Sequence, residues 1–333
     1  QTALAAVFVS GLIFIAISMF KVREAIVNAI PMSLKLAIGG GIGLFLALVA
    51  LKNAGIIVDN PATLVGLGDL KDPKVLLALF GLLLIVVMHH FKIRGAIIIS
   101  ILVVTGLATA MGLNEFQGVV RKIPSLAPTF MQMNFENLFT ASMVGVIFVF
   151  FLVDLFDSTG TLVGVSHRAG LLKDGKLPRL KKALFADSTA IVAGAALGTS
   201  SKKTYIKSAS GVAAGGRTGL TAVVVSVLFL LCLFLAPLAQ SVPSFATAPA
   251  LLFVGVLMIQ GITHIEWDDI TEAVPAFMTI IFMPFAYSIA DGIAMGFISY
   301  AVIKLCTGKA STVPYMVWIV AVLWAIKFEC FGG

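Results

Sequence analysis

The sequence has little charge. Only 12% of its 333 residues are Asp, Glu, Lys or Arg, whereas 59% are hydrophobic and the mean hydropathy is +1.07. A soluble domain usually carries about 25% charged residues. These values exclude an ordinary soluble domain and predict a polytopic membrane protein embedded in a lipid bilayer.

Cysteine is also scarce, and metal-binding patterns are absent. The three cysteines, Cys232, Cys306 and Cys330, lie far apart and form no Cys-x-x-Cys or Cys/His spacing, so neither a disulfide framework nor a zinc site is expected. His89 and His90 end an apolar run without a second ligand pair, which favours an interfacial position over a metal site. No nucleophile with an adjacent base is evident, so we expect neither an enzyme nor a cofactor.

The positive charge lies in connectors. The net charge is +7, but Lys and Arg residues lie between apolar runs instead of along one face, which argues against nucleic-acid binding. Basic connectors at 21–28, 91–94 and 157–182 alternate with balanced ones at 52–74 and 112–136. The positive-inside rule therefore places the basic connectors in the cytoplasm.

Apolar runs predict about eleven membrane segments, since a spanning helix needs roughly 20 mostly apolar residues. Several are short or broken. The chain enters the first at once after Gln1, with no basic leader, so we expect a piece of a longer chain. The predicted segments are 2–20, 32–51, 75–90, 95–112, 138–156, 184–198, 218–238, 248–262, 274–286, 289–305 and 313–330.

Two further patterns have competing interpretations. Gly39, Gly40, Gly41 and Gly43 resemble a phosphate-binding loop, but no Gly-Lys-Ser/Thr follows, so close helix packing is favoured. An acidic cluster lies between later spans and could suggest acid/base chemistry, but Trp267 beside it favours an interfacial amphipathic segment. The acidic cluster consists of Glu266, Asp268, Asp269 and Glu272.

Two acids mark the end of the fifth predicted span. Asp154 and Asp157 are three residues apart, which places both carboxylates on neighbouring surface of a helix. Acids at membrane depth are usually functional, and Gly160 leaves room for a ligand to approach the backbone. The alternative is that Asp157, with Ser158 and Thr159, caps a helix end.

The stretch from Gly198 to Gly219 turns polar and glycine-rich between two apolar runs. Backbone that breaks its helix at membrane depth is tolerated where protein or a water-filled cavity satisfies its amides. Transporters tend to bind their substrates at such breaks. We therefore expect this stretch, together with the two acids, to form the functional centre.

These motifs resemble one transporter family over essentially the whole chain. The chain is similar to the AzgA-type branch of the nucleobase/cation symporter-2 family, the bacterial adenine and guanine/hypoxanthine permeases. The most specific matching segments are 153–165 (VDLFDSTGTLVGV), 198–201 (GTSS), 204–206 (TYI), 208–222 (SASGVAAGGRTGLTA) and 249–258 (PALLFVGVLM). Weaker matches are 51–56, 274–277 and 296–300.

The resemblance implies an all-α, uracil-permease-like fold of fourteen segments in two inverted repeats. The chain would start at the fourth segment, and a broken segment with a short strand would lie near 199–208. The implied core (substrate) domain comprises 1–20 and 137–240, the gate domain comprises 21–112 and 241–333, and 113–136 form an outer connector.

The resemblance also implies a binding site. Asp157 falls where the family presents an acid to the nucleobase, with Thr161 one turn on, and Asp154 and Asp157 are the implied proton-coupling candidates. The broken segment would contribute Ser200, Tyr205, Ile206, Lys207 and Ser208.

The sequence departs from the family pattern at three lysines. Lys207 stands where the family has a glutamate, and Lys202 and Lys203 replace an uncharged pair. An ammonium group has three donors and no acceptor, so Lys207 does not reproduce the chemistry of a glutamate. We expect Lys207 to pair with Asp157 in the substrate position.

The implied function is proton-coupled transport of purine nucleobases, with adenine favoured over guanine or hypoxanthine, by an elevator-like movement of core against gate. The expected location is the bacterial inner membrane, with dimerisation through the gate domain as an option. The alternative is a truncated or altered relative that does not transport and acts as an interaction or structural module.

Overall fold

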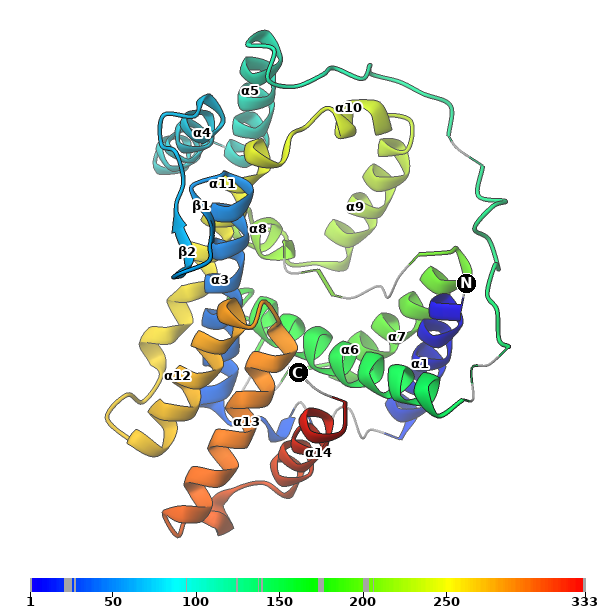
Figure 1. Cartoon of the computed structure of the whole chain (residues 1–333), viewed down its shortest axis with the longest axis vertical. Coiled ribbons are helices and arrows are strands. Elements are labelled where there is room, and N and C mark those ends of the chain that lie inside the picture. Colours follow the sequence, from blue (N-terminus) through cyan, green and yellow to red (C-terminus); the bar gives the residue numbers. More distant parts are fainter. Residues whose placement is uncertain are drawn as a thin grey trace. The chain divides into compact units, whose positions relative to one another are not determined.

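Most of the described residues in the computed structural model lie in helices (Figure 1). It describes residues 2–20, 26, 28–93, 95–123, 125–136, 138, 140–172, 177–199, 204–205 and 207–331. Within helices, the side chains of residues 141, 142, 145, 149, 152, 153, 156, 157, 330 and 331 lie outside that description. The chain falls into two compact units.

Each of the eleven predicted segments contains a helix. Among the described residues, five helices are long and apolar enough to cross a membrane. The helices are α1 (Thr2–Met19), α3 (Met32–Asn53), α4 (Pro73–His90), α5 (Ala96–Ala110), α6 (Ala141–Arg168), α7 (Leu180–Ala196), α8 (Ser208–Ala213), α9 (Gly219–Cys232), α10 (Ala236–Gln240), α11 (Ser244–Ile259), α12 (Ile270–Phe285), α13 (Ile289–Cys306) and α14 (Tyr315–Phe331), with short 3₁₀ turns η1 (Gln260–His264) and η2 (Ala310–Thr312).

The main departures from prediction lie between the spans. Strands β1 (Ile57–Asn60) and β2 (Leu64–Leu67) form an antiparallel hairpin inside the predicted 52–74 connector. Helix α6 continues to Arg168, twelve residues beyond the predicted end of its span at residue 156. Apolar patterning ends where α6 turns polar, so it underestimates a helix whose last turns are hydrophilic.

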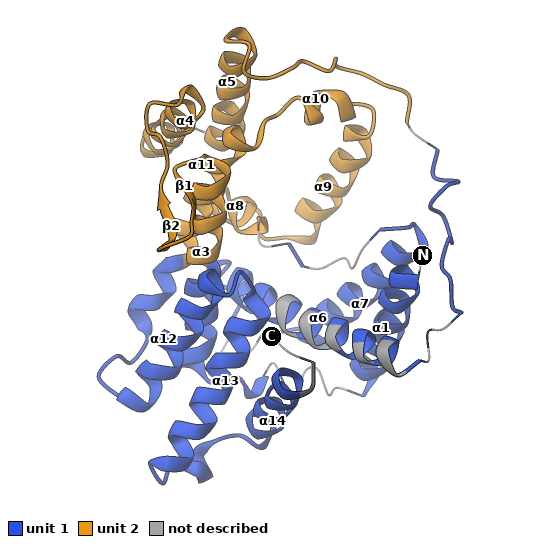
Figure 2. Cartoon of the chain, in the orientation of Figure 1, with its two compact units in different colours: residues 1–42, 125–206, 259–333 blue, residues 43–124, 207–258 orange. Residues whose placement is uncertain are grey.

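The two units are made of interleaved stretches of chain (Figure 2). Unit 1 contains residues 1–42, 125–206 and 259–333, and unit 2 contains residues 43–124 and 207–258. One boundary falls inside the predicted outer connector, and another falls among the glycines of α3. These boundaries differ from those of the core and gate domains that the family resemblance implies, and the core and gate assignment stays a prediction.

Unit 1 is packed through glycines. Helix α12 lies beside α13, and a Cβ atom built on Gly292 would come within 2.2 Å of Met283 Cγ and 2.9 Å of its backbone nitrogen. In α3, a Cβ on Gly41 would lie 3.2 Å from both Ile280 Cα and the Thr279 carbonyl oxygen. The packing interpretation is therefore confirmed for Gly41, since small residues let helix backbones approach closely.

Glycines also allow close helix contacts in unit 2. Helices α4 and α5 pair side by side, and the Ser100 hydroxyl donates a 2.8 Å hydrogen bond to the Gly81 carbonyl. A Cβ on Gly255 of α11 would lie 2.7 Å from the Gly43 carbonyl oxygen of α3. The first part of the outer connector is tied to this unit, because the Arg121 amide donates to the Phe234 carbonyl at 3.1 Å.

We predict that Gly292→Ala destabilises the protein by about 1–3 kcal/mol, since the added methyl group meets backbone atoms that side-chain rotation does not move. Gly106→Ala in α5 is the matched control, because a Cβ there would meet nothing within 4 Å. Thermal unfolding in detergent measures both variants. Equal melting temperatures for the two would contradict the packing argument.

Candidate functional site

Helix α6 buries a stripe of polar side chains inside unit 1. Asp154, Ser158 and Thr161 are 2%, 1% and 3% exposed, and their spacing of four and three residues places them on one helix face. The neighbouring Thr159 is 1% exposed, and its hydroxyl has no hydrogen-bond partner among the described residues. Buried polar groups are costly unless they are hydrogen-bonded, so this stripe is the strongest candidate site in the unit.

Asp187 of α7 connects α6 to the polar break. Its Oδ1 atom accepts hydrogen bonds from the Ser158 hydroxyl at 3.3 Å, the Thr204 amide at 3.1 Å and the Thr204 hydroxyl at 3.3 Å. Sequence reasoning missed this residue. The available signal was an acid inside an apolar predicted span, the criterion that singled out Asp154.

Helix α7 is itself held against α1. The two helices lie side by side (Figure 1), and the buried Ser188 hydroxyl donates to the Leu184 carbonyl at 2.8 Å and lies 3.4 Å from the Ser18 hydroxyl. A Cβ on Gly11 of α1 would lie 2.8 Å from Val192 Cγ2. Asp187 therefore projects from a closely packed helix.

The predicted break after α7 is present. The helix ends at Ala196, Gly198 has a φ of +85°, and the Met131 amide donates to the Ala196 carbonyl at 2.8 Å. A positive φ favours glycine. Of the described residues in the stretch where a short strand was expected, 199, 204, 205 and 207, none is in a strand, and α8 begins at Ser208.

The structure describes some of the predicted binding residues. Thr161 is buried, whereas Tyr205, Lys207 and Ser208 are exposed. Lys207 belongs to unit 2, where it lines a cavity of about 190 Å³ with side chains of α5 and α11. The Asp157 side chain, Ser200, Lys202, Lys203 and Ile206 lie outside the described residues, so the Asp157–Lys207 ion pair stays a prediction.

Two expectations about the α6 acids need correction. Asp157, Ser158 and Thr159 do not cap a helix end, because α6 runs on to Arg168. Gly160 also leaves no open space for a ligand, since its hypothetical Cβ would lie 2.8 Å from Ile293 Cδ1 and 3.1 Å from Ile38 Cγ2. Helices α13 and α3 fill the room beside this glycine.

A second polar cluster in unit 1 centres on an ion pair that sequence reasoning missed. Lys304 of α13, 4% exposed, places its Nζ 2.6 Å from Glu272 Oε1 and donates to the Thr271 hydroxyl at 2.8 Å. The Tyr300 hydroxyl donates to Glu272 Oε1 at 3.2 Å, and the Ser33 hydroxyl donates to Oε2. Glu272 thus has three donors on its two oxygens.

The prediction of an interfacial amphipathic segment is consequently wrong for Glu272, whereas Asp269 lies part-exposed at the start of α12 and does not contradict it. Glu272 forms the ion pair above, and Asp269 is the N-cap of α12, accepting from the Thr271 amide at 2.8 Å. Hydrogen bonds from the Thr271 hydroxyl and amide, with the Lys309 ammonium nearby, hold the pKa of Asp269 below its usual value. Periodicity does not reveal such specific pairing.

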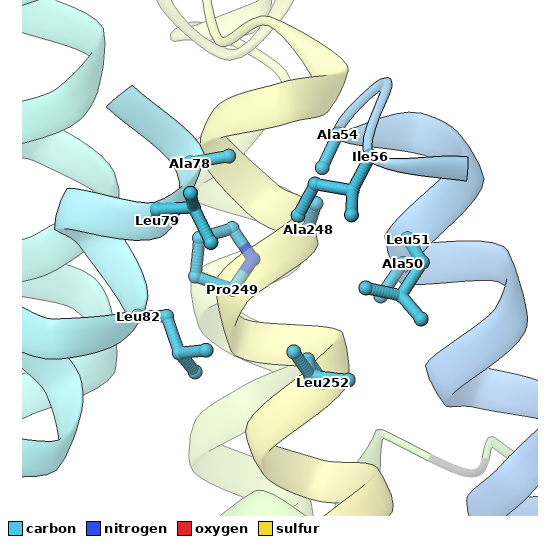
Figure 3. Close-up of a pocket in the computed structure, with 10 residues that line it drawn as sticks. All are labelled: Ala50, Leu51, Ala54, Ile56, Ala78, Leu79, Leu82, Ala248, Pro249 and Leu252. Carbon is cyan, nitrogen blue, oxygen red and sulfur yellow. The ribbon is translucent and has the colours of Figure 1, made fainter. Parts of the chain in front are cut away.

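A cavity in unit 2 lies between α3, α4 and α11 (Figure 3). Its ten lining residues are Ala, Leu, Ile and Pro, and its volume is about 10 Å³. That volume holds about one water molecule, and a dry apolar void offers such a water no hydrogen-bond partner. We regard it as a packing defect rather than a binding site.

Comparison with known proteins shows which family the chain belongs to. The profile of the Permease family matches residues 1–295. The chain belongs to this family. The permease is 46% identical to the adenine permease AdeQ of Escherichia coli, over 98% of this chain and 74% of AdeQ. It is also 46% identical to the guanine/hypoxanthine permease PbuG of Bacillus subtilis, over 98% of this chain and 75% of PbuG.

Solved structures show the same fold. The permease matches the transmembrane domain of a cyanobacterial bicarbonate transporter, BicA, with a TM-score of 0.54 at 19% identity, over 97% of this chain and 76% of that one. It matches SLC26A9 with a TM-score of 0.56 at 12% identity, and the match covers 92% of this chain and 51% of the SLC26A9 chain. The all-α, uracil-permease-like fold class is confirmed. The permease is a multi-pass inner-membrane transporter and not an enzyme.

We predict that Lys304→Met destabilises the permease by about 3 kcal/mol, because it leaves the mostly buried Glu272 carboxylate, 17% exposed, without its cation. The double variant Lys304→Met/Glu272→Gln should recover much of that loss. Lys52→Met is the control, since its ion pair with Asp59 is exposed and worth about 0–1 kcal/mol.

Thermal unfolding in detergent compares the three variants with the unaltered permease. A double variant as unstable as Lys304→Met alone would show that the loss does not come from the unpaired carboxylate.

Proposed function

We propose that this permease transports purine nucleobases. The observation that carries the proposal is 46% identity, over nearly the whole chain, to relatives named as adenine and guanine/hypoxanthine permeases. Identity at that level over 98% of the chain favours a shared substrate class. We favour adenine over guanine or hypoxanthine as the substrate.

The proposed binding site combines the polar face of α6 with the segment that leads into the first residue of α8. Asp157 and Thr161 from α6 and Ser200, Tyr205, Ile206, Lys207 and Ser208 from the break are the proposed contacts. A purine offers ring N–H donors to carboxylate and hydroxyl acceptors. Support comes from the buried polar stripe of α6 and the Thr204–Asp187–Ser158 connection, which joins the break to that helix.

Transport is proposed to be coupled to protons. Asp154 and Asp157 are the coupling candidates, because an acid on a helix in the membrane interior is costly when charged and can gain a proton. Asp154 is 2% exposed, which supports that role. The proposed movement is elevator-like, of a core domain against a gate domain, with dimerisation through the gate.

A second candidate is a non-transporting relative that serves as an interaction or structural module. The observation that favours it is Lys207, an exposed cation at a position proposed to contact the base. An ammonium group cannot accept a hydrogen bond from a ring N–H. Transport assays separate the two candidates.

We expect cells without their own purine permeases to take up labelled adenine when they express this protein, and a proton uncoupler to lower that uptake. Thr161→Val should raise KM about two- to tenfold through loss of one hydrogen bond. Thr109→Val is the matched control, because that hydroxyl bonds the Thr105 carbonyl of its own helix. Absence of uptake of both adenine and hypoxanthine would favour the non-transporting module.

Lys207→Glu should increase purine uptake, because a carboxylate accepts from N–H donors and can exchange a proton. The matched comparison is Lys207→Gln, which removes the positive charge without supplying an acid. Uptake rates at equal membrane abundance measure the effect. If Lys207→Glu transports no faster than the unaltered protein, Lys207 does not occupy the substrate position.

A further inference from the structure

Asp187 accepts hydrogen bonds from two separate parts of the proposed site. Its Oδ1 atom receives the Ser158 hydroxyl of α6 and both the amide and the hydroxyl of Thr204. Three donors on one carboxylate oxygen restrict the positions of all the groups involved. Hydrogen bonds to an ionised acceptor are roughly twice as strong as neutral ones.

The residues that it holds adjoin the proposed contacts. Ser158 directly follows Asp157 and lies one helical turn before Thr161. Thr204 directly precedes Tyr205, in a stretch where the backbone has left α7 and has not yet entered α8. Non-helical backbone lacks its own hydrogen-bond ladder, so an external acceptor has a large effect on its conformation.

The helix that carries Asp187 is well packed. Its neighbour Ser188 is fully buried, bonds within α7 and contacts Ser18 of α1. Leu184 and Ile191 of the same helix are also buried. The carboxylate therefore projects from a packed helix, and movement of Thr204 relative to α6 breaks its bonds.

We propose that Asp187 is a positioning residue for substrate binding, holding Thr204 and the adjoining Tyr205 in register with the Asp157–Thr161 turn of α6 through its bonds to Thr204 and Ser158. This role rests on the proposed purine transport. Asp187 acts through the residues that it orients, and it does so as an acceptor of hydrogen bonds. Its charge strengthens those bonds.

The test compares variants of the full-length permease in labelled-adenine uptake at equal membrane abundance. Asp187→Ala should raise KM about tenfold while Vmax changes much less, because several charge-assisted hydrogen bonds are lost. Asp187→Asn keeps an oxygen acceptor, so KM should rise only about two- to threefold. Asp59→Ala, in the exposed β1 strand, is the matched control and should leave KM unchanged.

Hydrogen–deuterium exchange gives a second readout that does not need substrate. In Asp187→Ala, peptides that contain Thr204 and Tyr205 should exchange faster, while peptides from α4 and α5 should keep their protection. Uniformly faster exchange, or a lower Vmax with unchanged KM, would show a general structural role and overturn the proposal. Failure of the unaltered protein to take up purine would defeat the proposed function alone, because the exchange result still tests Asp187.

Two variants of the residues that donate hydrogen bonds to Asp187 test the proposal if Asp187→Ala does not fold. Ser158→Ala and Thr204→Val each remove one hydroxyl donor and should each raise KM about threefold, as expected for loss of a single hydrogen bond to a charged group. Wild-type KM values in both would overturn the proposal. An Asp187→Asn variant with the same KM as Asp187→Ala would overturn it as well, since accepting ability would then be irrelevant.

Discussion

The structure depends on one constraint, which is that polar groups inside an apolar bundle must be hydrogen-bonded. Hydrocarbon supplies no partners, so a buried hydroxyl, carboxylate or ammonium group that finds none in the protein, as the Thr159 hydroxyl does among the described residues, is costly. Glu272 and Lys304 satisfy one another with help from Tyr300, Ser33 and Thr271. Asp187 does the same for Ser158 and Thr204. These contacts join elements far apart in sequence.

Close helix packing makes such pairing feasible. In a membrane the hydrophobic effect does not drive helices together, and association relies on van der Waals contact and hydrogen bonds. Gly292 and Gly296 let α13 approach the backbone and side chains of α12, and those two helices carry the Lys304–Glu272 pair. Gly11 brings α1 close to α7, the helix of Asp187. The glycines therefore allow the helix contacts across which the buried charged groups find their partners.

The sequence predicted the framework well, because apolar length is a strong signal. All eleven predicted spans contain helices, and the break after Gly198 was expected. The end of α6 was misplaced because its last turns are polar, and the β1–β2 hairpin lies in a connector with no apolar period. Periodicity reports which side chains avoid water, and it carries no information about a helix that continues with polar residues.

The candidate site was predictable only in part, for a different reason. Asp154 was singled out by its place in an apolar helix and Thr161 by the family resemblance, and both are buried. Asp187 satisfied the same criterion, but its importance comes from Ser158 and Thr204, which lie 29 and 17 residues away in sequence.

Lys304 illustrates the same limit, since its partner Glu272 lies on another helix and was grouped with neighbouring acids as surface. A single sequence shows that a charge lies within a span, and the cost of burying it shows that a partner must exist. The identity of that partner depends on which helices meet, and at Gly41, Gly292 and Gly296 those meetings are set by space that a missing side chain leaves. The glycines of a membrane protein are therefore the place to begin when looking for the partners of its buried charges.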